Sequence, residues 1–247
     1  KSTLMRTIAT LQDPDSGSIT YNGMDIIKEK HELRKVLGLL PQEFDFYPRI
    51  TAWEMMMHFA ALKGIRTLKD RKAAVEQFLK IVNLYSDRSR KIGGFSGGMK
   101  QRLGIAQALL GNPEIIIVDE PTAGLDPKER HHFHNILSEI GQEKIVILST
   151  HIVDDVSELC SSMAIINKGE VKMTSNPLEA IEQIKGRIWR KLIEKETIEQ
   201  YRELNIISNR LFTGKLMIHV ISETDPGNDF SPVDPDSEDV YFSTIPH

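Results

Sequence analysis

The sequence predicts an α/β protein with a mostly parallel sheet, an inserted helical segment and a small C-terminal α+β extension. Apolar runs alternate with amphipathic stretches from Lys1 to about Lys185, as expected where a helix follows each strand of a parallel sheet. Four consecutive branched residues at 115–118 suit a strand that is buried on both faces. The 247 residues, 40% hydrophobic and 27% charged, provide enough chain for one large domain or two small ones.

Composition excludes several classes of protein. The 31 basic and 35 acidic residues give a net charge of −4, so no broad basic surface points to nucleic acid as a partner. The single cysteine, Cys160, forms no internal disulfide and is expected to be a small buried residue. The apolar runs are far shorter than the roughly 18 residues of a membrane span. A role at a membrane would therefore need a partner.

The N-terminal part is expected to contain a helix at 2–11, which turn residues end at 13–17. A short strand at 18–21 and a turn at Asn22-Gly23 follow. Another strand at 36–40 ends at Pro41.

The middle of the chain changes period. Residues 51–84 repeat their apolar side chains at helical spacing, so we interpret them as a helical insertion. The block 95–151 then predicts helix, strand, helix and strand in that order. A further strand at 163–167 ends in a turn at Lys168-Gly169.

Residues 186–247 form a predicted C-terminal accessory region. A helical stretch through Ile198, Tyr201 and Leu204 precedes a strand at 216–221. The segment 225–247 holds four prolines, the last of them Pro246, and six acidic residues without one Lys or Arg, which predicts an extended, loop-rich tail. A solvated tail without function is the alternative.

Polar residues follow two of the predicted strands. Asp119 and Glu120 come directly after the run at 115–118, and His151 follows the strand at 144–150. Because ligands of α/β sheets bind at the carboxyl ends of the strands, these side chains lie where a site is expected. Taken singly, each could be an ordinary turn or cap residue.

Two further segments suit phosphate. Ser96 can cap an amphipathic helix while Gly97 and Gly98 let backbone N–H groups converge on an anion, although the alternative is an ordinary helix start. The residues Lys1-Ser2-Thr3 match the end of the phosphate-binding motif G-x-x-x-x-G-K-[ST]. The printed sequence does not include the glycine-rich loop of that motif, and we expect the sequence to be a piece of a longer chain.

The order of these segments resembles the nucleotide-binding subunit of ATP-binding cassette (ABC) transporters, in the bacterial exporter branch with a separate permease. The resemblance includes Leu40-Pro41-Gln42 and the run from Ala123 to Asp126, and it covers nearly all of 1–185. It implies a P-loop NTPase-type ATPase domain at 1–185, with a helical subdomain inserted at about 43–104, and an accessory region at 186–247. Phe95 and Met99 depart from the usual Leu-Ser-Gly-Gly-Gln signature.

The resemblance implies roles toward ATP and Mg²⁺ within one subunit. Lys1 would contact the β- and γ-phosphates, and Thr3 would sit near the α-phosphate. Mg²⁺ would be held by a hydroxyl, an amide and a carboxylate, from Ser2, Gln42 and Asp119.

Other residues would act in catalysis or across a dimer. The resemblance makes Glu120 the general base, His151 the reader of the γ-phosphate, and Gln42 the link to the attacking water. The signature residues would close over ATP held by a second ATPase subunit, identical or different, and Asp126 would lie at the dimer interface; the signature residues are Ser96, Gly97 and Gly98.

The expected function is ATP hydrolysis that drives solute export through a separate membrane permease, at the cytoplasmic face of the membrane. Phe44, Phe46 and Tyr47, with the Met55–Met57 run, could receive the permease or could form the subdomain's own core. The ending 234–242 resembles that of such exporter subunits. A soluble ABC ATPase of DNA repair or translation and a degenerate subunit without activity are the alternatives. The His131-His132-x-His134 cluster could hold a metal, but a surface helix fits its spacing better.

Overall fold

The computed structural model describes residues 1–44 and 46–245. By internal contacts the chain divides into two compact units, Lys1–His151 and Ile152–His247. All residues predicted to bind ATP or Mg²⁺ belong to the first unit.

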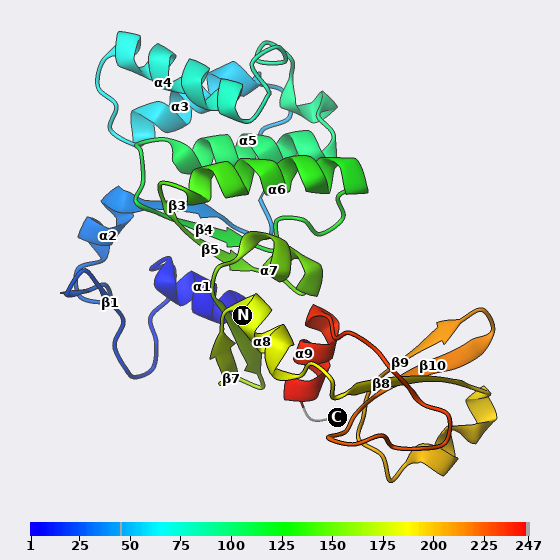
Figure 1. Cartoon of the computed structure of the whole chain (residues 1–247). Helices are drawn as coiled ribbons and strands as arrows, with labels where there is room; N and C mark the ends of the chain where they lie inside the picture. Colours follow the sequence, from blue (N-terminus) through cyan, green and yellow to red (C-terminus); the bar gives the residue numbers. More distant parts are fainter. Residues whose placement is uncertain (45, 246–247) are drawn as a thin grey trace. The chain divides into compact units, whose positions relative to one another are not determined.

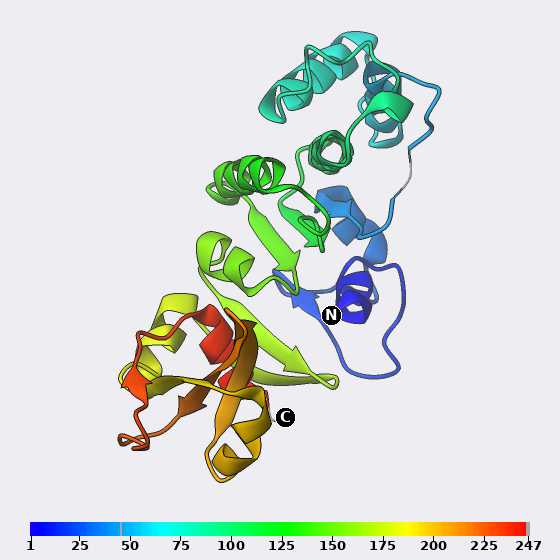
Figure 2. The same cartoon turned by 90° about the vertical axis from the view of Figure 1, so that its right-hand side faces the viewer.

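The first unit is built on a three-stranded parallel sheet in the order β3-β4-β5 (Figure 1). Its strands are β3 Leu37–Leu40, β4 Ile115–Asp119 and β5 Ile145–Ser149. Two helices, α5 Gly97–Leu109 and α6 Pro127–Gly141, lie side by side on one face, and α1 Ser2–Ile8 and α2 Lys30–Val36 lie on the other (Figures 1 and 2). The run 115–118 in β4 is buried, which confirms the prediction of a strand covered on both faces.

The N-terminal elements differ from the prediction in their bounds. The helix predicted at 2–11 ends at Ile8, since Thr10 adopts a left-handed backbone with φ of 58°. The strand predicted at 18–21 is shorter: β1 Thr20–Tyr21 pairs with β2 Met24–Asp25. The turn between them, at Asn22 and Gly23, has positive φ at both residues, as a tight hairpin turn requires. Helix α2 was not predicted, and it takes Val36 from the strand expected there.

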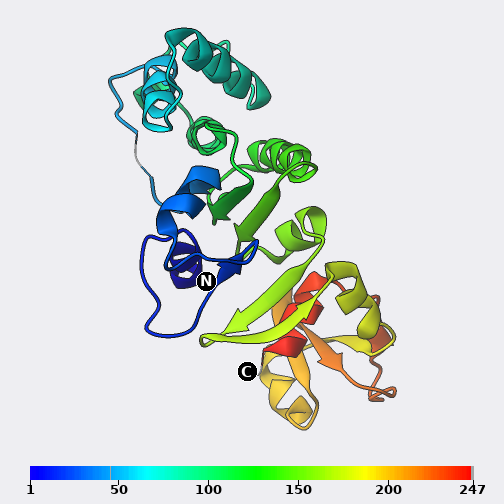
Figure 3. The ribbon, with the colours of Figure 1, turned by 90° about the vertical axis from the view of Figure 1, so that its left-hand side faces the viewer.

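The helical segment of the first unit follows the sequence closely. Helices α3 Ala52–Leu62 and α4 Leu68–Ile81 run in opposite directions (Figure 1) and pack together at one end of the unit (Figure 3), and the 3-10 helix η1 Ile92–Gly94 follows. Gly64, with φ of 81°, ends α3 in the turn between them. Thr51 and Thr67 cap the two helices through their hydroxyl oxygens. The prediction of helical structure over 51–84 is confirmed.

The second unit contains an antiparallel sheet in the order β11-β8-β10-β9. Its strands are β8 Ile188–Ile193, β9 Ile206–Phe212, β10 Lys215–Ile221 and β11 Ser231–Pro232. The other elements are α7 Val153–Leu159, the hairpin β6 Met163–Asn167 and β7 Glu170–Ser175, α8 Pro177–Gln183, the 3-10 helix η2 Lys195–Tyr201, and α9 Ser237–Thr244. The predicted turn at Lys168-Gly169 closes the hairpin.

One core joins the chain on both sides of residue 185. Ile165 and Ile184 precede that position, and they pack in one cluster with Ile188, Ile207 and Val240, which follow it. The boundary between the two compact units therefore lies after His151, whereas the sequence composition changes at about residue 185. Cys160 is half-buried, and burial raises the pKa of its thiol above the ordinary value.

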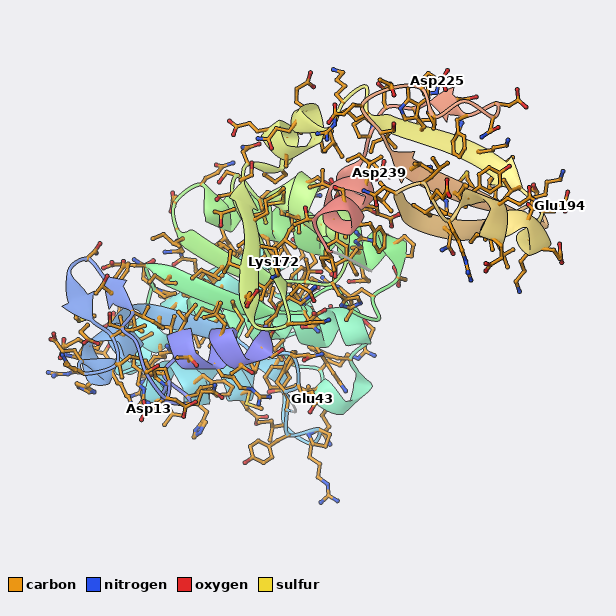
Figure 4. The ribbon with its side chains drawn as sticks, turned by 90° about the horizontal axis from the view of Figure 1, so that it is seen from below. Asp13, Glu43, Lys172, Glu194, Asp225 and Asp239 are labelled. Carbon is orange, nitrogen blue, oxygen red and sulfur yellow. The ribbon has the colours of Figure 1, made fainter. Side chains whose placement is uncertain are left out.

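The tail at 225–247 is not an extended loop throughout, which corrects the prediction. Asp236 and Asp239 form a reciprocal capping box at the start of α9, where Val240 is buried. The Asp239 carboxylate also accepts a hydrogen bond from His219 Nδ1 at 2.7 Å, and Figure 4 shows Asp239 on α9. Acidic residues of the tail therefore form the cap and first turn of a helix, which the composition did not predict. Pro246 lies outside the described residues.

Two predictions for the rest of the unit were incomplete. The stretch predicted as helical through Ile198 is the 3-10 helix η2 followed by a turn at Leu204. Strands β8 and β9 were not predicted, because charged residues such as Arg190 and Arg210 interrupt their apolar pattern. Within 1–44 and 46–245, no helix has both the length and the apolarity of a bilayer-spanning segment.

Candidate functional site

The carboxyl end of β4 carries a buried carboxylate. Asp119 is 6% exposed, and its Oδ1 accepts a hydrogen bond from Ser149 Oγ at the end of β5. The parallel register places Asp119 opposite Ser149, and places Leu40 opposite Val118. The three strands therefore end at one edge, as the sequence predicts.

Glu120 is the centre of the contacts at this edge. Its backbone is left-handed, with φ of 51°, and its N–H donates to the carbonyl of Ser149 at 2.9 Å. Its Oε2 is hydrogen-bonded to His151 Nδ1, and its Oε1 lies 3.5 Å from Lys1 Nζ. Lys1 Nζ also donates to the carbonyl of Thr150. The structure therefore brings Lys1 and His151 to Glu120, although they lie 119 and 31 positions away from it in the sequence. The Glu120 side chain is 10% exposed and lies between the lysine amine and the histidine ring.

Three other residues expected to bind nucleotide or Mg²⁺ are close in sequence to Lys1 or to the end of β3: Ser2, Thr3 and Gln42. Ser2 is the first residue of α1 and is half-buried, whereas Thr3 is exposed. The Thr3 carbonyl accepts hydrogen bonds from Thr7 Oγ1 at 3.0 Å and Gln12 Nε2 at 3.2 Å. Gln42 is exposed two positions beyond Leu40, the last residue of β3, which pairs with Val118 in β4.

A second cluster occupies the N-termini of α5 and α6. Ser96 caps α5 by accepting a hydrogen bond from the Met99 N–H at 3.2 Å. Asp126 caps α6 in the same way, with Glu129 N–H at 2.9 Å. Gly97 is exposed and Gly98 is buried. The signature residues and Asp126 therefore present two capped helix ends, each a positive end of a helix dipole.

Sequence reasoning missed three residues of these clusters. Ser149 was hidden because only strand register pairs it with Asp119. Arg102 and Glu129 form an ion pair between α5 and α6, with Nη2 and Oε2 3.2 Å apart. Glu129 stands three positions after the cap residue Asp126, which is a spacing that favours an acidic residue in a first turn.

The residues considered for a permease groove or a metal site differ in their burial. Met55 and Met56 are buried in the helical segment, whereas Tyr47 is 74% exposed. The rings of Phe44 and Phe46 meet edge to face at 5.1 Å. In the histidine cluster, His134 is buried in α6. Among the described residues no group of three or more His, Cys, Asp or Glu is arranged to hold a metal ion.

The fold and its clusters define a nucleotide-binding ATPase domain of the P-loop type, and comparison with known proteins gives the same class. The ABC transporter family pattern matches residues 1–123. The chain is 38% identical over 173 residues to the ABC transporter ATP-binding protein NatA of Bacillus subtilis, covering 69% of this chain and 70% of that protein. It is 36% identical to the probable multidrug ABC transporter ATP-binding protein YbhF of Escherichia coli, covering 76% of this chain and 32% of that protein.

A third relative and two solved structures belong to the same class of ATP-binding protein. The linearmycin resistance ATP-binding protein LnrL of Bacillus subtilis is 38% identical, with 69% of this chain and 55% of that protein covered. A dimeric ATP-binding cassette in a post-hydrolysis state, bound to ADP and Pi, has a TM-score of 0.63 at 26% identity over 71% of this chain and 79% of that chain. The ATP-binding subunit of an ABC transporter has a TM-score of 0.62 at 28% identity, over 74% and 76%.

The chain belongs to the ABC transporter family and is one of its ATP-binding domains. Members of this class bind ATP and hydrolyse it, and the chain is an ATP hydrolase of this type. It spans about a third of the Escherichia coli relative and over half of LnrL.

Proposed function

We propose that this chain is the ATP-hydrolysing subunit of an exporter, and that it works as a head-to-tail dimer on a separate membrane permease. The observation that carries the proposal is the convergence of Lys1, Glu120 and His151 at the carboxyl edge of the sheet. Phosphoryl transfer needs positioned charges more than covalent chemistry, and this edge supplies a carboxylate that contacts both a cation and an imidazole.

The three side chains have distinct roles in the proposal. Glu120 accepts the proton of the attacking water, and its near-complete burial keeps the carboxylate aimed from a fixed backbone. Lys1 neutralises charge on the β- and γ-phosphates, and His151 senses the γ-phosphate through its ring nitrogen. Because Lys1 and His151 both contact Glu120 here, arrival of ATP must redistribute these contacts.

The residues assigned to Mg²⁺ fit that ion. Asp119 provides a buried carboxylate oriented by Ser149, and Ser2 and Gln42 add a hydroxyl and an amide oxygen. Mg²⁺ prefers a small number of such hard oxygen ligands and keeps several waters. When bound, the ion would offset negative charge on the phosphates.

Export and membrane association are supported by the relatives' names and by exposed residues. YbhF is named as a probable multidrug transporter protein and LnrL as a linearmycin resistance protein, and these names support export as the direction of transport. The exposed ring of Tyr47 lies beside the helical segment and is available to a permease. In the proposal, the subunit binds its permease at the cytoplasmic face of the membrane.

The test is Glu120→Gln, measured in the chain as printed and in a version that carries a glycine-rich loop ahead of Lys1. The variant should lose ATP turnover while it accumulates as an ATP-bound dimer, because the amide no longer accepts the water's proton. Phosphate release and size-exclusion chromatography with light scattering measure the two effects.

The matched control is Glu139→Gln, the same change at an exposed position of α6. Ordinary turnover by the Glu120→Gln variant would remove Glu120 from the role of base. An inactive parent in both versions would favour a degenerate subunit. Copurification with a permease distinguishes a transporter subunit from a soluble ABC ATPase.

A further inference from the structure

Two charged residues join the helices that carry the second cluster. Arg102 on α5 and Glu129 on α6 are mostly buried, with 11% and 26% of their side chains exposed. Arg102 Nη2 lies 3.2 Å from Glu129 Oε2 and 3.4 Å from Oε1. Arg102 Nη1 donates to the carbonyl of Val82, just after α4, at 3.3 Å. One guanidinium therefore ties α5 to α6 and to the end of α4.

Glu129 contacts both ends of the second cluster. Its carboxylate lies against the backbone of Gly98, where an added Cβ would stand only 2.4 Å from Oε2. Its own N–H donates to the Asp126 side chain at 2.9 Å. The same residue thus touches the signature motif through its side chain and the cap of α6 through its backbone.

The hydrogen bonding of this pair is incomplete. In the pair, Arg102 Nε and Glu129 Oε2 are buried without a hydrogen-bond partner among the described residues, although Oε2 lies within ion-pair distance of Arg102 Nη2. The neighbouring Gln101 Oε1 is in the same state. A buried ion pair with unused donors and acceptors stabilises a fold poorly compared with apolar side chains of similar volume. Such a pair is better explained by the geometry that it holds.

We propose that Arg102 and Glu129 are a positioning pair, which locks the N-termini of α5 and α6 together so that Gly97, Gly98 and Asp126 approach a facing subunit's nucleotide as one rigid surface. This inference rests on the proposed function, in which two subunits close over ATP. Neither residue belongs to the cluster around Glu120. Loss of the pair should therefore weaken closure of the dimer and leave nucleotide binding by the single subunit unchanged.

The experiment measures two quantities in a parent protein that carries Glu120→Gln, so that ATP is not consumed. The first is the Mg-ATP concentration that gives half-maximal dimer, measured by analytical ultracentrifugation. The second is the affinity of the dilute monomer for a fluorescent ATP analogue. Glu129→Gln is added to the parent, with Glu139→Gln on the same helix as the matched control.

Glu129→Gln should raise the Mg-ATP concentration for half-maximal dimer about tenfold, a coupling of ordinary size between linked sites, at unchanged monomer affinity. Glu139→Gln should change neither. An unchanged dimerisation curve for Glu129→Gln overturns the positioning role, and so does an equal loss of dimerisation and monomer affinity. A parent that binds the analogue but never dimerises overturns the proposed dimer instead.

A second variant keeps the test decisive if the single change unfolds the protein. Arg102→Met combined with Glu129→Gln removes both charges and leaves no buried ion unpaired. This double variant should fold and should still dimerise poorly. A folded double variant that dimerises like the parent overturns the proposal.

Discussion

Two neighbouring glycines show how differently single residues are constrained in this molecule. A Cβ at Gly97 would meet no atom of the described residues within 4 Å. A Cβ at Gly98 would stand 2.4 Å from Glu129 Oε2 and 2.7 Å from its Cδ. Glu129 cannot simply turn away, because Arg102 holds it. Position 98 therefore requires glycine for space rather than for backbone freedom.

We predict that Gly98→Ala lowers the free energy of unfolding by about 1–3 kcal/mol, the usual cost of overpacking a filled site. Gly97→Ala is the control and should be neutral or slightly stabilising, since alanine is the better helix former. Urea denaturation followed by circular dichroism checks both. Equal midpoints for the two variants would contradict the packing argument.

Among the elements, α3 illustrates how a cap links stability to pH. The Thr51 N–H and hydroxyl each donate to Glu54 Oε2 at 2.8 Å, and the Glu54 N–H donates back to the Thr51 hydroxyl at 3.2 Å. The backbone hydrogen bond, then the hydroxyl, lowers the pKa of Glu54 below its ordinary value. The charged carboxylate is therefore favoured in the folded state.

The direction of the pH effect follows. The stabilising contribution of a carboxyl with a lowered folded pKa is complete above its unfolded pKa and disappears as the pH falls through the folded one. We predict that Glu54→Gln is less stable than the parent at neutral pH and that the difference narrows as the pH falls below about 4. Urea midpoints across the acid range measure it, with Glu43→Gln, at an exposed residue, as control. A gap that stays constant with pH would refute the role of the charge.

For the whole molecule, every residue assigned to nucleotide lies in the unit formed by residues 1–151. We predict that Mg-ATP slows amide hydrogen exchange in α1 and at the ends of β4 and β5, and leaves β8 and β10 unchanged, because bound ligand protects the segments whose opening would release it. Mass spectrometry of peptides from both units makes the measurement. Equal protection in both units would contradict the assignment of all ligands to the first.

How much of this could be predicted depended on whether the signal was local. The run at 115–118 and the helical spacing of apolar residues over 51–84 are local patterns, and both predicted their elements. Strands β8 and β9 are stabilised by pairing with β10 across the chain, so their own residues gave little indication. Glu120 and His151 could be placed at one edge from strand order alone, whereas the Arg102–Glu129 pair depends on how two helices pack and has no signature in the sequence.

The left-handed backbone of Glu120 has an evolutionary consequence. Glutamate is strained at φ of 51°, and glycine or asparagine would relieve that strain. Replacements that abolish the proposed base are therefore the ones that relax the chain, so conformational energy and fitness select in opposite directions at this position. A library of variants screened for heat resistance alone should become enriched in glycine or asparagine at position 120. The selected proteins would be more stable and would lack the proposed catalytic base.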